Sequence, residues 1–153
     1  MNALLQPVSH FRPMAVEDVE RVVDIERNIY AFPWSHGNFT DSLHAGYNCW
    51  VNQREGGIVG YGVMMLAAGE AHLLNLGIAA QWQGQGLGRE ALGHMIEVAR
   101  DHRAEVMFLE VRTSNIVARR LYATRGFRVL TIRKNYYPAA QGRENAVLME
   151  LAL

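Results

Sequence analysis

The spacing of hydrophobic positions changes several times along this chain, from helical intervals to short continuous runs. Apolar residues recur every three or four positions in four segments that predict helices: 16–28, 35–43, 87–102 and 114–126. Short apolar runs bounded by turn residues predict strands: 47–52, 58–67, 72–78, 106–111, 127–133 and 146–151. We therefore expect an α+β fold, a mixed central sheet of about six to seven strands flanked by about four helices.

Individual residues mark the ends of these segments. Ser35 precedes the second helix and Ser114 or Asn115 the fourth, and residues of these types cap helix N-termini. Gly126 stands where a left-handed residue would end the fourth helix. The glycine pair 56–57 between two apolar runs predicts a hairpin turn.

Length and composition are those of one globular domain, which we assign to residues 1–153. Hydrophobic residues make up 50% of the chain and charged residues 20%, which excludes a disordered chain and a coiled coil. Fifteen basic residues balance fifteen acidic ones, so no overall field holds the molecule on nucleic acid or an anionic membrane. The longest apolar stretch, 58–68, is shorter than the roughly 20 residues of a membrane span. We expect neither nucleic acid nor membrane as a direct partner.

Neither a targeting segment nor a cysteine framework is evident. Met1–His10 has no basic segment followed by a long apolar run, so we expect no signal peptide and a cytoplasmic protein. Cys49 is the only cysteine, which excludes an intrachain disulfide and a Cys-rich zinc site, and we expect no metal. We interpret Cys49 as a buried strand residue, and the isolated His72 and His102 as structural residues.

The charges are unevenly distributed along the chain. No acidic residue lies between Glu110 and Glu144, and eight basic ones do: Arg112, Arg119, Arg120, Arg125, Arg128, Arg133, Lys134 and Arg143. Solvated helix and strand faces explain such a run, and a phosphate-bearing ligand or an acidic partner explains it equally well.

The segment Gln83–Arg89 is the most informative motif in the sequence. It is rich in glycine and joins a predicted strand to a predicted helix. Glycines let backbone N–H groups approach a ligand, and a helix N-terminus adds free donors and partial positive charge, so the segment suits phosphate. It lacks the Gly-Lys-Ser/Thr of a nucleotide-hydrolysing loop and the glycine spacing of a dinucleotide-binding fold. A glycine-rich turn without a ligand is the alternative.

The pattern Gln-x-x-Gly-x-Gly at 83–88 resembles the acetyl-coenzyme A motif of the GNAT N-acetyltransferases, and the order of predicted elements fits that fold. Four further segments resemble the RimI type, bacterial enzymes that acetylate the N-terminal alanine of a small-subunit ribosomal protein: Ala31–Ser35, Leu109–Asn115, Leu121–Phe127 and Arg133–Glu144. Two positions depart from the family pattern. Relatives usually have Ala-Val-x-Pro where this chain has Gly77–Ala80, and Asn145 replaces a frequent aspartate.

The resemblance implies acetyl-coenzyme A as co-substrate and a set of residues that bind it. In such enzymes a backbone N–H of a splayed central strand polarises the thioester carbonyl, the glycine turn holds the pyrophosphate, and an asparagine contacts the pantetheine arm. The binding residues implied in this chain are Leu76, Gly77, Ile78, Gly84, Gln85, Gly86, Leu87, Gly88, Arg89 and Asn115. Arg89 is equally well explained as an exposed residue of the first helical turn.

Tyr122 and Glu110 are the catalytic candidates. The resemblance implies that Tyr122 protonates the departing thiolate; it follows Asn115 by seven residues, two helical turns and about 10 Å along one face. Glu110 shares a predicted strand face with Val106 and Phe108, and a carboxyl group in apolar surroundings can act as a general base, directly or through water. The alternatives are a core tyrosine with a satisfied hydroxyl and a glutamate paired with an arginine.

The acceptor that the resemblance implies is the N-terminal peptide of a ribosomal protein, bound by a monomer or weak oligomer. Four aromatic residues could form walls for the peptide or belong to the core and loops: Phe32, Trp34, Tyr136 and Tyr137. Acids on the first helix could favour a basic peptide or simply be solvated: Glu17, Asp18, Glu20, Asp24 and Glu26. A GNAT enzyme for lysine or another amine, and a non-catalytic coenzyme-binding module, are the competing functions.

Overall fold

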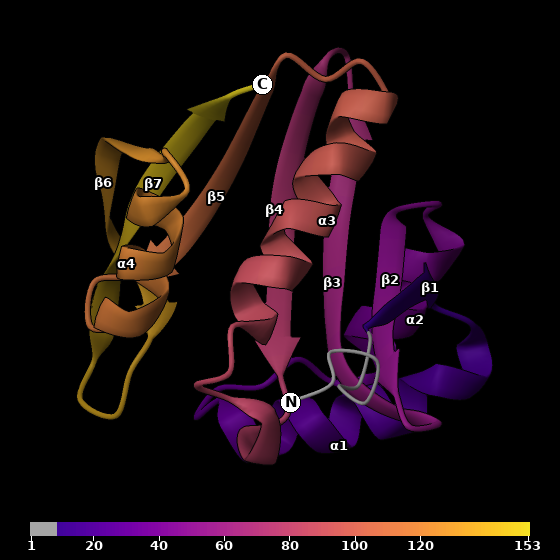
Figure 1. The fold of residues 1–153 in the computed structure, drawn as a ribbon. Coiled ribbons are helices and arrows are strands. Elements are labelled where there is room, and N and C mark those ends of the chain that lie inside the picture. The colour runs from indigo at the N-terminus through magenta and orange to yellow at the C-terminus, as the bar shows by residue number, and fades with distance from the viewer. Residues whose placement is uncertain (1–8) are drawn as a thin grey trace, which may run out of the picture. The chain divides into compact units, whose positions relative to one another are not determined.

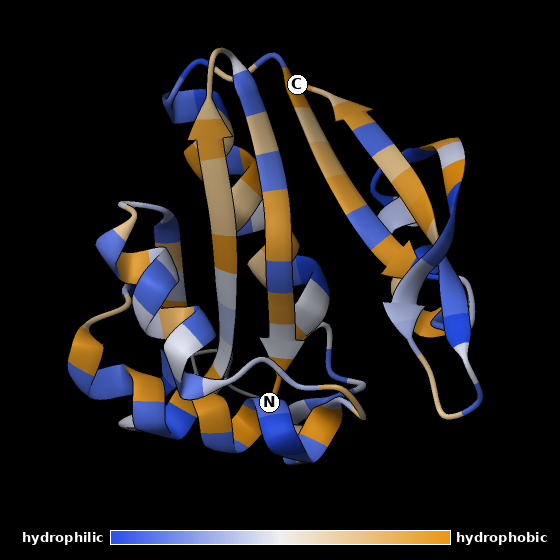
Figure 2. Cartoon of the chain, turned by 180° about the vertical axis from the view of Figure 1, so that it is seen from behind, coloured by the Kyte–Doolittle hydropathy of each residue, from blue (hydrophilic) through white to orange (hydrophobic). Residues whose placement is uncertain are grey.

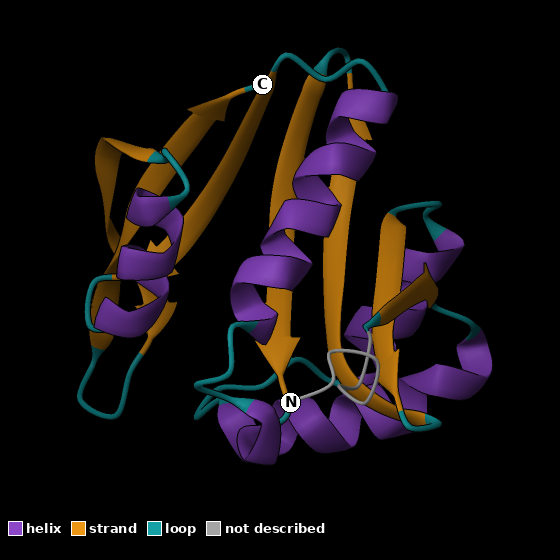
Figure 3. Cartoon of the chain, viewed as in Figure 1, coloured by secondary structure: helices purple, strands orange, loops and turns teal. Residues whose placement is uncertain are grey.

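The structure is a computed structural model that describes residues 9–153, and its elements are labelled in Figure 1. The described residues form four α-helices: α1 (Val19–Ile29), α2 (His36–His44), α3 (Leu87–Asp101) and α4 (Ile116–Thr124). They also form seven strands: β1 (His10–Pro13), β2 (Asn48–Arg54), β3 (Gly57–Ala67), β4 (Glu70–Ile78), β5 (Val106–Arg112), β6 (Arg128–Pro138) and β7 (Arg143–Ala152). Helices and strands thus mix as the periodicity predicts (Figure 3), and the α+β class is confirmed. The expectation about a signal peptide falls mostly on residues 1–8, outside the described residues.

The strands form one mixed sheet with the hydrogen-bonded order β1-β2-β3-β4-β5-β7-β6. β4 and β5 are parallel, whereas β1 and β2, β5 and β7, and β6 and β7 pair antiparallel. The parallel ladder pairs Glu70 with Val106 at one end and Leu73 with Leu109 at the other. The segment Leu76–Ile78 follows the last paired residue of β4 in this ladder.

The chain divides into two compact units, which are described separately. The first unit contains the chain up to Val63 together with Asn75–Ala91, and the second contains Met64–Leu74 together with Leu92–Leu153. The units share three elements, because β3, β4 and α3 each pass from one unit to the other.

In the first unit, α1 presents the apolar face that its sequence predicts. Val19, Val22, Val23 and Ile25 are buried, and the alternation of apolar and polar residues along this helix is visible in Figure 2. The hairpin between β2 and β3 turns at Glu55 and Gly56, whose φ angles are 50° and 81°. Positive φ at both central residues is typical of the tight turn that matches the twist of paired strands.

In the second unit, alternate residues of β5 point into the core. Met107, Leu109 and Val111 are buried, while the residues between them are partly exposed. α4 lies in front of the strands β5, β7 and β6 in Figure 1 and behind them in Figure 2, so it covers one face of these strands. Gly126 follows α4 with φ 103°, which confirms the predicted left-handed residue at its end.

The structure differs from the predicted elements in three places. β1 was not predicted, because its four residues have no apolar run and depend on pairing with β2. β6 continues to Pro138 and β7 begins at Arg143, so the loop between them is shorter than expected. A register shift between Arg133 and Tyr137 lets the polar residues there continue the strand.

Two further predictions concern buried and membrane-spanning segments. Cys49 is buried on β2, as predicted, and burial raises the pKa of its thiol to about 11. Among the described helices, none has both the length and the hydropathy needed to cross a membrane.

Candidate active site

The glycine turn lies in the first unit, immediately before α3. Gly84 and Gly86 have φ angles of 76° and 83°, and a side chain at either position would meet no atom within 4 Å. Glu90 donates the first helical hydrogen bond, to the Gly86 carbonyl. The N–H groups of the first turn of α3 therefore have no acceptor within the helix. An open approach and free backbone donors fit a pyrophosphate group.

Side chains around this turn hold its backbone in place. Gln83 donates from Nε2 to the carbonyl of Ile78 at 2.9 Å, which ties the turn to the end of β4. Arg54 lies 5.7 Å from the ring centre of Trp82 and 3.3 Å from a carboxylate oxygen of Glu90. Arg89 is exposed on the first turn of α3, so either interpretation of this residue stands.

The end of β4 explains one departure from the family pattern. A Cβ atom at Gly77 would lie 2.3 Å from the hydroxyl oxygen of Tyr61, closer than any real contact. Glycine is therefore required here by the approach of Tyr61. Tyr30 donates a short hydrogen bond from its hydroxyl to the carbonyl of Leu76.

Glu110 lies on β5 in the second unit, and its side chain is only 8% exposed. One carboxylate oxygen is 2.5 Å from Nε2 of His72, and the other is 3.6 Å from Nε of Arg133. The Glu110 carboxylate is thus hydrogen-bonded to a histidine and close to an arginine. Both interpretations from the sequence, a general base and a glutamate paired with an arginine, remain open. His72 is not the isolated residue that the sequence suggested, whereas Nδ1 of His102 lies 2.8 Å from the Val98 carbonyl, as a structural residue would.

Tyr122 is buried on α4, and its ring packs edge-on against Phe127 at a centroid distance of 5.7 Å. Burial raises the pKa of the Tyr122 hydroxyl to about 12, so this group keeps its proton at neutral pH. Within residues 9–153, the hydroxyl has no hydrogen-bond partner. Both interpretations of Tyr122 from the sequence, the general acid and the core tyrosine, therefore remain predictions.

Asn115 is the N-cap of α4, one of the two residues expected there. Its Oδ1 accepts a hydrogen bond from the Ala118 amide at 3.1 Å, which leaves the Nδ2 group for another partner. Glu144 anchors the loop before this cap: it accepts from the Ser114 amide at 2.9 Å and from Arg112 at 3.2 Å. Ser114 first and then Arg112 lower the pKa of Glu144 to about 2.

The second departure, Asn145, keeps an acceptor function. Its side-chain oxygen accepts a hydrogen bond from the backbone amide of Asn135 at 3.0 Å. Asn135 has a φ angle of 53° within the irregular part of β6. The amide oxygen of Asn145 thus supports the hairpin as a carboxylate oxygen would.

The aromatic residues proposed as acceptor walls have mixed environments. In the first unit, Phe32 is 43% exposed, while Trp34 packs against Phe39 at a centroid distance of 5.2 Å. In the second unit, Tyr136 is 41% exposed, and the ring of Tyr137 lies 4.5 Å from the guanidinium carbon of Arg112. Phe32 and Tyr136 are therefore surface residues and not part of the core.

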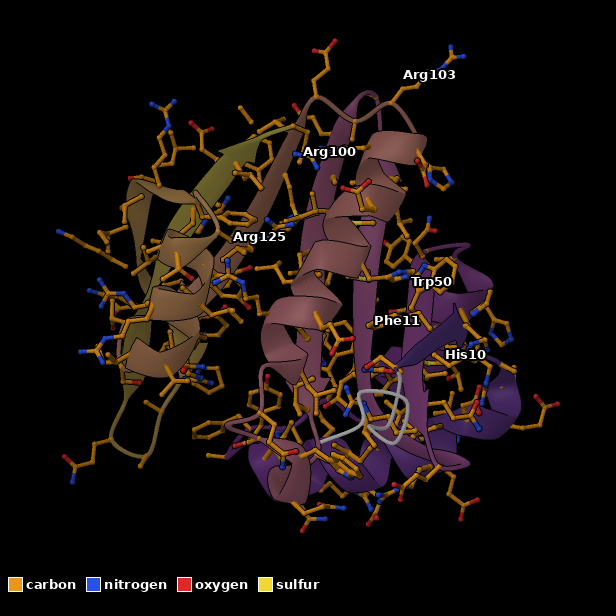
Figure 4. The ribbon with its side chains drawn as sticks, viewed as in Figure 1. His10, Phe11, Trp50, Arg100, Arg103 and Arg125 are labelled. Atoms are coloured by element: carbon orange, nitrogen blue, oxygen red, sulfur yellow. The ribbon has the colours of Figure 1, made fainter. Side chains whose placement is uncertain are left out.

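Intramolecular contacts engage part of the basic run. Arg112, Arg128 and Arg133 form ion pairs with Glu144, Glu150 and Glu110, respectively. Figure 4 shows Arg125 at the end of α4, and it shows Arg100 and Arg103 at the end of α3, all within the second unit. In the described part of the chain, no group of three or more His, Cys, Asp or Glu residues could hold a metal ion.

Two residues with potential roles escaped the sequence interpretation. His72 contacts Glu110 through a strand pairing that no local pattern reveals. Glu26 is buried on α1 at 2% exposure, and its place within the apolar stripe of that helix was the signal that could have identified it. Asp18 and Asp24 are paired with Arg12 and Arg21, so not all acids of this helix are free for a peptide.

Comparisons with known proteins agree with this geometry. The model of the acetyltransferase (GNAT) family matches residues 19–127. The chain is 35% identical over 136 residues to the "[Ribosomal protein bS18]-alanine N-acetyltransferase" of Escherichia coli, covering 89% of this chain and 92% of that protein. The crystal structure of the ribosomal-protein-S18-alanine N-acetyltransferase from Escherichia coli superposes with a TM-score of 0.89 and 33% identity, covering 95% and 94% of the two chains. A putative acetyltransferase from Salmonella typhimurium, solved with acetyl-CoA, shares the fold with a TM-score of 0.80 at 19% identity, covering 95% of this chain and 94% of that one.

Proposed function

Because this chain belongs to the GNAT family of N-acetyltransferases, we propose that it acetylates the N-terminal alanine of the small-subunit ribosomal protein bS18 in the cytoplasm, using acetyl-coenzyme A. The observation that carries this assignment is the similarity to a bS18-alanine N-acetyltransferase over about nine-tenths of both chains. In this proposal the two compact units make up one catalytic domain.

The first unit contributes backbone groups that suit the coenzyme. In the proposal, the amides of Gly84–Arg89 hold the pyrophosphate, and a backbone N–H of Leu76–Ile78 polarises the thioester carbonyl. The open surroundings of Gly84 and Gly86 support the first role. The position of Leu76–Ile78 beyond the β4–β5 ladder supports the second.

The second unit contributes the side chains that would move protons. Glu110 takes a proton from the acceptor amine, directly or through water, and Tyr122 gives a proton to the departing thiolate. The Tyr122 hydroxyl has no hydrogen-bond partner among residues 9–153, which supports this role, since a hydroxyl bound to another group would first have to break that bond. His72 is placed to orient the Glu110 carboxylate. Asn115 contacts the pantetheine arm through the amide group that its capping bond leaves free.

An α-amine suits a single carboxylate base better than a lysine does. With pKa values near 8 and 10.4, forming the neutral amine at pH 7 costs about 1.4 kcal/mol for an α-amine and about 4.6 kcal/mol for a lysine. Acetyl-coenzyme A supplies the activated acyl group, and the protein has to supply only the proton transfers and the positioning.

A competition between two peptides tests the proposed acceptor. One peptide begins with alanine and carries the N-terminal sequence of bS18, and the other has the same sequence with a blocked N-terminus and one internal lysine. We expect mass spectrometry to show acetylation of the free α-amine in preference to the lysine. Preferential acetylation of the lysine would contradict the proposal, and replacing the first alanine by a bulky residue measures how narrow the selection is.

A further inference from the structure

Glu26 is a buried carboxylate that the proposed chemistry does not use. It lies on α1, one turn before the helix ends, and is 2% exposed. Among the ion pairs of the described residues, none includes Glu26. A buried carboxylate without a cationic partner is costly unless hydrogen bonds satisfy it. The hydrogen-bond donors that surround Glu26 therefore indicate its role in the structure.

Three donors from three segments of the first unit meet on this carboxylate. Oε1 accepts from the Tyr61 hydroxyl at 2.5 Å and from Nδ2 of Asn75 at 3.0 Å. Oε2 accepts from the backbone amide of Trp34 at 3.0 Å. Burial, with a smaller contribution from Glu26, raises the pKa of Tyr61, so this hydroxyl keeps its proton and donates.

Two of these donors lie in or next to segments expected to meet the substrates: the segment that could form a wall for the acceptor peptide and the strand end proposed to polarise the thioester. Trp34 belongs to the segment between α1 and α2 that also carries the exposed Phe32. Asn75 directly precedes the strand end Leu76–Ile78. The Tyr61 ring end fills the space above Gly77, where a Cβ atom would collide with it. One carboxylate thus holds the loop that would face the acceptor peptide and the strand end that would face the thioester.

The donors around Glu26 require a hydrogen-bond acceptor at the positions of both carboxylate oxygens. The Trp34 amide is a fixed donor, because a backbone N–H cannot change its direction or become an acceptor. A glutamine side chain offers one acceptor and one NH₂ group, so it would present a donor either to Trp34 or to the Tyr61 and Asn75 pair. Tyr61 can rotate its hydroxyl, but the Trp34 amide has no such freedom.

We propose that Glu26 is a positioning residue for the acceptor: its carboxylate fixes the Ala31–Ser35 segment relative to the end of β4 and thereby sets the affinity for the peptide. This inference rests on the proposed function and adds a residue to it. Glu26 itself touches neither the peptide nor the reacting atoms in this proposal. Its effect passes through the Trp34 amide and through Asn75.

The test compares Glu26→Gln with Asp41→Asn, which removes an exposed carboxylate from α2 of the same unit. For Glu26→Gln we expect the peptide KM to rise about tenfold, which corresponds to about 1.4 kcal/mol, with kcat changed less. The affinity for acetyl-coenzyme A, measured by calorimetry, should stay within about twofold of wild type. Asp41→Asn should leave all three quantities unchanged. Amide hydrogen exchange at Trp34 should become faster in Glu26→Gln alone, and this readout does not depend on activity.

Several outcomes would overturn the inference. An unchanged peptide KM in folded Glu26→Gln, or equal losses of peptide and coenzyme binding, would contradict it. If Glu26→Gln does not fold, Tyr61→Phe decides the matter, because it removes one donor and keeps the ring; it should raise the peptide KM severalfold and leave coenzyme affinity intact. An inactive wild type with a Trp34 amide protected by Glu26 would instead show that the proposed acceptor, and not the role of Glu26, is wrong.

Discussion

The polar atoms of Glu26, Glu110 and Tyr122 have very different surroundings, and these surroundings set their chemistry. Glu26 accepts three hydrogen bonds from uncharged donors, which fixes it in place. Glu110 lies between a histidine and an arginine, and Tyr122 has a buried ring with a hydroxyl that no described residue engages. The proposed positioning residue, base and acid thus differ in the partners of their polar atoms.

Replacing Tyr122 by phenylalanine tests the proposed role of this residue as the general acid. We expect turnover at saturating substrates to fall roughly tenfold to ten-thousandfold, the usual range for losing general acid–base catalysis. Coenzyme affinity should change little, because the ring still packs on Phe127. Because burial raises the pKa of Tyr122 to about 12, the wild-type hydroxyl stays protonated up to about pH 11. Deprotonation of Tyr122 should therefore cause no fall in the wild-type rate below that pH. Unchanged turnover with chemistry shown to be rate-limiting would return Tyr122 to a structural role.

At the scale of elements, three features place the candidate residues. The parallel ladder of β4 and β5 ends at Leu73 and Leu109, which leaves the strand end Leu76–Ile78 outside it. α3 begins directly after Gly86, so its free N–H groups lie at the glycine turn. Glu144 on β7 holds the loop before α4, and this loop sets where the cap Asn115 stands.

The Glu144 anchor predicts a pH-dependent contribution to stability. The pKa of Glu144 is lowered from 4.5 to about 2 in the folded protein, first by Ser114 and then by Arg112. Its contribution is therefore fully present above about pH 4.5 and is lost as the pH falls toward 2. In urea unfolding, Glu144→Gln should be less stable than wild type at pH 7, and the difference should narrow between pH 4.5 and 3.5. The exposed Glu70→Gln is the control, and a difference independent of pH would contradict the anchor.

At the scale of the whole molecule, charge and coenzyme binding matter most. Fifteen basic and fifteen acidic residues cancel, so the net charge offers no general attraction for polyanions. Recognition of a phosphate-bearing coenzyme must then come from a local arrangement such as the glycine turn. Ligand binding at that turn would also contribute to the stability of the native state.

Thermal unfolding measures this contribution. Acetyl-coenzyme A at about 100 times its Kd should stabilise the protein by about 2.7 kcal/mol, which raises Tm by about 5 to 11 °C in a chain of this size. Gly86→Ala should lose much of this shift, because a side chain at φ 83° strains the turn. Gly69→Ala is a matched control with φ 78° and equally open surroundings, and it should keep the shift. An equal shift in both variants would place the coenzyme elsewhere.

The sequence alone determined the elements with strong local signals. The apolar stripe of α1, the Ser35 and Asn115 caps and Gly126 are confirmed, because each depends on the spacing and conformational preference of neighbouring residues. The glycine motif and four short segments also identified the family, which the comparisons confirm.

Tertiary structure alone decided the environment of individual polar atoms. The bond between His72 and Glu110 joins two strands, the Glu26 network joins a helix, a loop and two strands, and β1 forms only through pairing with β2. The need for glycine at position 77 likewise comes from Tyr61, sixteen residues earlier in the chain. Local propensity carries no information about such partners, because their distance along the chain is unrelated to their distance in space. A hydrogen bond depends on the distance and the angle between donor and acceptor in space.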